Sequence, residues 1–105
     1  MENFKQRADF RNLLRNKMTE HLGQYGYSLS FDNQNQDQGI SKNWVFRLQY
    51  SGKKKIEIHN DDWRDYTEYF ILKVNDKELF MLNLDNYKSI EIAFEELTTK
   101  LIDKV

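Results

Sequence analysis

Residues 44–58 read WVFRLQYSGKKKIEI, and this stretch decides the fold. On both sides of Ser51-Gly52 apolar and polar residues alternate, which is the period of strands that each bury one face. A three-residue loop, 51–53, keeps the apolar side chains of both strands on one face, whereas a two-residue loop mixes the faces. It gives three cross-strand pairs: Leu48 with Ile56, Phe46 with Ile58, and Arg47 with Glu57. The stretch therefore predicts a β-hairpin in this register.

A second hairpin is predicted over residues 66–74 and 77–84, because Asn75-Asp76 between them is a typical turn pair. With these two residues as the loop, Lys73 lies opposite Glu78 and both faces carry apolar side chains. One face is expected to hold Phe70, Leu72, Val74, Leu79 and Met81, and the other Tyr69, Ile71, Phe80, Leu82 and Leu84. Since both faces are apolar, we expect both to be covered.

The flanking segments have helical spacing. Residues 4–22 place apolar side chains on one stripe, followed by a glycine that favours the end of a helix: Phe10, Leu13, Leu14, Met18, Leu22, then Gly23 and Tyr25. Residues 27–31 alternate as a further strand. A C-terminal helix is predicted from about Ser89, with the stripe Ile90, Ala93, Phe94, Leu97 and Leu101.

The predicted fold class is α+β: an N-terminal helix, a five-stranded antiparallel meander sheet and a C-terminal helix, in one domain over residues 1–105. The expected core combines the helical stripes with the inward-facing strand positions. Its predicted members are Leu14, Met18, Leu29, Phe46, Leu48, Ile56, Ile58, Phe70, Leu72, Phe94 and Leu97.

Composition excludes several classes of protein. The 105 residues carry a formal net charge of -1 and include no cysteine, so disulfides, cysteine-ligated metals and a thiol nucleophile are excluded. No apolar run is long enough to span a membrane, and we expect a soluble, cytoplasmic protein without membrane association. No catalytic motif, phosphate-binding loop or metal-ligand spacing occurs, so we expect no enzyme activity, no cofactor and no metal site.

The apolar second hairpin gives the main functional hypothesis. If both helices lie on one face of the sheet, the other face of this hairpin is left for a protein partner, which is unidentified. The predicted contact residues are Trp63, Arg64, Tyr69, Ile71, Phe80 and Leu82. The sequence thus predicts a small, non-catalytic protein-interaction module, with self-association into a homodimer as another use of the same face. Its Lys, Asn, Ile and Tyr content is typical of AT-rich bacterial or mobile-element genes, which include small inhibitors and accessory proteins.

Two alternative hypotheses remain at this point. Residues 1–58 hold ten basic and six acidic residues, and their basic side chains form a helical ridge and a turn cluster that would suit phosphates. The predicted nucleic-acid contacts are Arg7, Arg11, Arg15, Lys53, Lys54 and Lys55. The other alternative is an apolar ligand held between a helix and the sheet.

Overall fold

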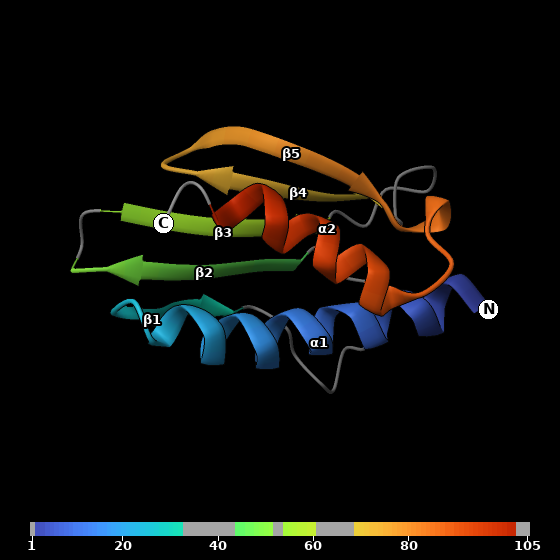
Figure 1. Cartoon of the computed structure of the whole chain (residues 1–105), viewed down its shortest axis with the longest axis horizontal. Helices are drawn as coiled ribbons and strands as arrows, with labels where there is room; N and C mark the ends of the chain where they lie inside the picture. Colours follow the sequence, from blue (N-terminus) through green and yellow to red (C-terminus); the bar gives the residue numbers. More distant parts are fainter. Residues whose placement is uncertain (1, 33–43, 52–53, 61–68, 103–105) are drawn as a thin grey trace.

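The computed structural model describes residues 2–32, 44–51, 54–60 and 69–102. Its elements are α1 (Glu2–Gly23), β1 (Tyr27–Asp32), β2 (Trp44–Tyr50), β3 (Lys54–Asn60), β4 (Tyr69–Val74), β5 (Lys77–Asn83), η2 (Leu84–Asn86) and α2 (Ile90–Ile102). The strands form one antiparallel sheet in the order β1-β2-β3-β4-β5 (Figure 1). The predicted helix, five-stranded meander and helix are therefore confirmed. None of the described helices is long and apolar enough to cross a membrane.

Both helices pack on the same face of the sheet. In Figure 1 α2 crosses in front of the central strands, and α1 runs along the β1 side. The side chains of both helices join those of the strands in one core, and the Phe10 ring of α1 meets the Phe70 ring of β4 edge-on, 4.7 Å between centroids. No described helix covers the opposite face, so the expectation that both faces of the second hairpin are covered is not met within the described residues.

The helices bury the stripes that their spacing predicts. Phe10, Leu14, Met18 and Leu22 of α1 are buried, and so are Ala93, Leu97 and Leu101 of α2, whereas Phe94 is only half-buried. Tyr25 does not extend the stripe of α1. It follows the end of the helix and is half-exposed, because the chain turns at Gly26 (φ +93°) towards β1.

Gly26 is required by a close approach as well as by its positive φ. A Cβ at this position would lie 2.5 Å from Cε2 of Tyr50, so a side chain there would collide with the tyrosine ring. The turn therefore seats the start of β1 against the end of β2, where the Tyr27 and Tyr50 rings are 5.5 Å apart.

The first hairpin has the predicted register. Leu48 pairs with Ile56, Phe46 with Ile58, and Arg47 with Glu57, and residues 51–53 separate the strands. The apolar members of these pairs are buried beneath the helices. Strict alternation was a sufficient guide here because β2 and β3 pair without an irregularity.

The second hairpin departs from the predicted faces. Asn75 and Asp76 have positive φ, as a two-residue turn of this type requires, and Lys73 lies opposite Glu78 as predicted. The next pair, however, joins Leu72 to Phe80, so β5 has one extra residue at this point.

This bulge reverses the faces of the rest of β5. Phe80 and Leu82 lie with Phe70 and Leu72 on the helix-covered face, and Met81 pairs with Ile71 on the opposite face. The prediction that grouped Phe80 and Leu82 with Tyr69 and Ile71, and Met81 with Phe70, was wrong for this reason.

A second bulge reshapes β1. Leu29 pairs with Leu48, but the next pair joins Phe31 to Arg47 and Asp32 to Phe46. Phe31 is thereby moved away from the helices, and Asp32 is moved towards them. Leu29, predicted in the core, is 49% exposed, because β1 is an edge strand with a neighbouring strand on one side only.

Candidate functional site

The face without a described helix is the candidate functional surface. We call it the uncovered face and define it by nine of its outward-pointing residues: Phe31, Val45, Arg47, Glu57, His59, Ile71, Lys73, Glu78 and Met81. Strand pairing arranges them in two rows across the sheet. The charged row begins at Phe31 on the edge strand and continues through the charged residues Arg47, Glu57, Lys73 and Glu78. The apolar row holds Val45, Ile71 and Met81, with the polar His59 between Val45 and Ile71.

Glu57 lies at the centre of the charged row and is only 5% exposed. Arg47 donates from Nε to one carboxylate oxygen at 2.6 Å, and His59 Nε2 lies 3.2 Å from the other, which places the proton of this contact on Nε2. The Arg47 guanidinium also lies 5.4 Å above the Phe31 ring. The centre of the uncovered face is therefore a fixed set of polar contacts.

The carboxyl group of Glu57 is held in its charged form. Burial alone would raise its pKa, but the hydrogen bonds and positive charges of Arg47 and His59 outweigh this effect and lower the pKa below 4.5. In the folded protein the charge of Glu57 is thus balanced by the side chains around it.

Because the folded-state pKa of Glu57 is lowered, its carboxylate stabilises the fold above its ordinary pKa of 4.5, and this stabilisation is lost as pH falls through the lower native pKa. We expect Glu57→Gln to be less stable than the wild type at about pH 7 and to lose less stability on acidification. Unfolding by urea at about pH 7 and pH 3 measures this difference. Glu95→Gln, at an exposed position of α2, is the matched control and should keep the acid sensitivity of the wild type. Equal acid sensitivity of Glu57→Gln and the wild type would contradict the assignment.

The basic ridge of α1 points inward. Arg7 is 4% exposed and Arg11 is 1% exposed, so neither side chain lies on an open surface, and their assignment as nucleic-acid contacts stays a prediction. Arg11 donates from Nε to Asn60 Oδ1 at 2.8 Å, and its guanidinium lies 5.6 Å above the Trp44 ring. The aromatic ring and the amide provide an interior site for a charged group, which helical spacing alone does not reveal.

Arg15 closes the same cluster next to β1. It donates from Nε to Asp32 Oδ2 at 2.5 Å, while Trp44 donates from Nε1 to Oδ1 of the same carboxylate at 2.8 Å. The bulge in β1 is what brings Asp32 to this position. Arg15, Asp32 and Trp44 therefore connect α1, β1 and β2.

The lysines do not join this cluster. Lys54 and Lys55 begin β3, whereas Arg11 bonds Asn60 at the end of the same strand, so the two basic groups lie at opposite ends of the sheet. Lys55 is paired with Asp76 at 2.8 Å. Lys53 lies outside the described residues. The structure thus does not assemble a continuous basic surface from the predicted nucleic-acid contacts that it describes.

A groove of about 310 Å³ lies between α1 and α2. Its lining residues are Lys17, Glu20, His21, Gln24, Phe94 and Thr98. The hypothesis of an apolar ligand needs a space between a helix and the sheet, whereas this groove lies between the two helices.

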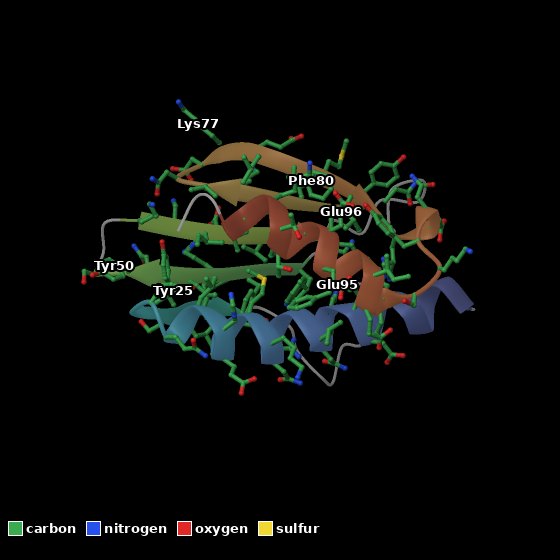
Figure 2. The ribbon with its side chains drawn as sticks, viewed as in Figure 1. Tyr25, Tyr50, Lys77, Phe80, Glu95 and Glu96 are labelled. Atoms are coloured by element: carbon green, nitrogen blue, oxygen red, sulfur yellow. The ribbon has the colours of Figure 1, made fainter. Side chains whose placement is uncertain are left out.

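The predicted partner contacts fall into three groups. Tyr69 and Ile71 alternate with the buried Phe70 and Leu72 and so lie on the side without a described helix. Phe80 and Leu82 lie on the covered face, and Figure 2 shows Phe80 beside α2. Trp63 and Arg64 lie outside the described residues. Leu82 is buried in the core.

Phe31 and Met81 are the two most exposed apolar residues of the uncovered face. Sequence reasoning missed Phe31 and grouped Met81 with Phe70 and Leu72 instead of with Ile71. Two bulges place Phe31 and Met81 on the uncovered face, and no residue type in the sequence marks either bulge. The Arg47–Glu57 pair, in contrast, was available from the alternation of β2 and β3.

Within the described segments no group of three or more His, Cys, Asp or Glu side chains could hold a metal ion. No known protein family, curated protein or solved structure matches the chain.

Proposed function

We propose that this chain is a non-catalytic protein-interaction module that binds a protein partner through the uncovered face. One observation carries the proposal: an apolar row lies beside a fixed charged row, on a face that no described helix covers. Burying one large apolar side chain contributes roughly 1.5–3 kcal/mol, so Met81 and Phe31 are favourable contacts for a partner.

The charged row supports the same function. Arg47 is held by Glu57 and lies over Phe31, so its side chain is already ordered before a partner binds. Ordering long side chains opposes association, and a surface that is already ordered avoids much of this cost. The opposite charges of neighbouring residues in the row would also fix the orientation of the partner.

Two finer assignments belong to the proposal. We place the module in the cytoplasm and, from its Lys, Asn, Ile and Tyr content, among the small inhibitors and accessory proteins of bacterial or mobile-element genes. In a homodimer, the uncovered face would bind a second copy of the chain instead of a different protein.

Met81→Lys is expected to reduce partner recovery about tenfold or more, because it puts a charge at the most exposed apolar position of the face. Cross-linking in cells of the source organism, affinity capture and quantitative mass spectrometry measure the recovery. Ile92→Lys is the matched control: Met81 is 49% exposed and Ile92 is 47% exposed, but Ile92 lies on α2.

The proposal requires a protein that the wild type and Ile92→Lys recover equally and that Met81→Lys does not. If all three chains recover the same proteins, the uncovered face is not the binding surface. If the wild type is a dimer by light scattering and Met81→Lys is a monomer, the partner is a second copy of the chain.

A further inference from the structure

The two edges of the sheet are chemically different. β5, at one edge, begins with exposed Lys77 and Glu78, and charged residues of this kind discourage another strand from pairing. β1, at the other edge, reads Tyr-Ser-Leu-Ser-Phe-Asp, and its four middle residues are all exposed. Its single charge, Asp32, is bonded to Arg15 and Trp44. The exposed part of β1 is therefore uncharged.

Large apolar side chains gather around this uncharged edge. Leu29 and Phe31 of β1 are exposed, and Tyr25 and Tyr50, which lie beside the start of the strand, are exposed as well. Figure 2 shows Tyr25 and Tyr50 at the same end of the sheet. These are four of the six large hydrophobic residues that are exposed within the described residues. The edge thus combines exposed apolar surface with a strand that pairs, among the described strands, with β2 alone.

We infer that β1 accepts an extended, apolar segment of another protein as a sixth strand. An edge strand presents a row of backbone N–H and C=O groups along its free side, and an extended backbone is the ligand that matches such a row. Leu29 and Phe31 lie on opposite faces because of the bulge, so the added segment needs apolar side chains on both of its faces. Since the exposed edge carries no charge, the added segment needs no charged side chain for pairing with it.

The position of α1 disfavours a second copy of the chain as the occupant. Figure 1 shows α1 extending past β1, and its buried stripe places it on the covered face. Antiparallel pairing of two β1 strands about a two-fold axis would bring both α1 helices into the same space, whereas packed helices need about 8–10 Å between their axes. An isolated extended segment brings no helix and avoids this collision.

The probe for this surface is a phage-displayed library of random 12-residue peptides, selected against the full chain. We expect uncharged peptides with apolar residues at neighbouring positions to be enriched. Leu29→Lys should weaken their binding about tenfold or more in an anisotropy titration, because it places a charge at the edge. Ile92→Lys is the matched control, since Leu29 is 49% exposed and Ile92 on α2 is 47% exposed, and it should leave this binding unchanged.

Synthetic peptides with N-methyl groups at every second residue test the backbone pairing itself. Only alternate N–H groups of an added strand face β1, so one methylation phase should abolish binding and the other should preserve it. Equal effects of both phases, or binding that survives Leu29→Lys, would overturn the inference, as would a library from which no peptide is enriched. A dimer that Leu29→Lys dissociates would overturn the choice of occupant.

This surface shares Phe31 with the uncovered face, but Leu29 belongs to the edge alone and Met81 to the face alone, so substitutions at these two residues let the two proposals fail separately. Leu29→Lys should lose the selected peptides and keep the partner captured through the uncovered face, whereas Met81→Lys should do the reverse. A chain that binds peptides at β1 but loses no partner with Met81→Lys supports the edge and contradicts the proposed function of the face.

Discussion

Trp44→Ala is expected to lower the free energy of unfolding by about 3–5 kcal/mol, the usual cost of removing a buried aromatic ring. Trp44 is fully buried, its ring stacks on Phe46 with 5.6 Å between centroids, and its edge meets Phe70. Alanine would also leave Arg11 and Arg15 without the ring beneath their guanidinium groups. Urea unfolding followed by circular dichroism measures the loss.

Trp44→Phe distinguishes the contribution of the aromatic ring from that of the indole N–H. Phenylalanine keeps most of the apolar packing but cannot donate to Asp32, so a smaller loss of about 1–3 kcal/mol is expected. Tyr50→Ala, which truncates a half-exposed aromatic residue of the same strand, should cost less than Trp44→Ala. If Trp44→Ala and Tyr50→Ala cost the same, the ring of Trp44 is not the centre of this cluster.

Asn60→Ala is expected to cost about 3 kcal/mol, because it removes the acceptor of a buried guanidinium. Asn60 is fully buried at the end of β3, where its Oδ1 accepts from Arg11 and its Nδ2 donates to the carbonyl oxygen of Tyr69 at 2.9 Å. One amide thus joins α1, β3 and β4. The substitution leaves Arg11 charged and buried with its Nε hydrogen bond lost.

Asn12→Ala is the matched control for this prediction. Asn12 also accepts a hydrogen bond from a guanidinium, that of Arg15 at 2.7 Å, but in an exposed position. Water replaces an exposed acceptor, so the expected loss is within about 0.5 kcal/mol. Equal unfolding free energies of the two variants would show that burial does not decide the contribution of the amide.

The interior position of Arg11 also changes the meaning of a charge reversal. Arg11→Glu would put a carboxylate beside Asn60 Oδ1 and the Trp44 ring, so it would damage the fold before it tested any phosphate contact. A test of nucleic-acid binding therefore belongs at exposed basic residues such as Lys17 or Lys77.

The local sequence pattern predicted the structure correctly in strands and helices that contain no bulge. The register of the first hairpin followed from the alternation of Phe46 and Leu48 with Arg47, because a slip of one residue would place a charge in the core. The same alternation located the Arg47–Glu57 pair at the centre of the candidate site. The stripes of both helices followed from their spacing in the same way.

Local pattern was a poor guide wherever a bulge occurs. A bulge inserts one extra residue into a strand, so the side chains beyond it face the opposite side from the one that alternation predicts. The residue types of Leu79 and Ser30, where the two bulges lie, do not indicate them. Phe80, Leu82 and Met81 were therefore each assigned to the wrong face of β5, and Phe31 was missed as a surface residue. Leu29 was predicted in the core and is exposed because β1 lies at the edge of the sheet. The alternation of residues does not show which strand has only one neighbour.

The sequence by itself determined the order of helices and strands, the apolar stripes and the first hairpin, because these depend on residues close together in the chain and on periods of 2 and 3.6. Only the tertiary structure decided which face stays uncovered and which arginines are buried. Those outcomes depend on contacts between distant residues: Arg11 with Asn60, 49 positions apart, and Arg15 with Asp32, 17 apart. An arginine on a helix is a surface charge or a core residue according to the ring and acceptor that the rest of the fold brings to it.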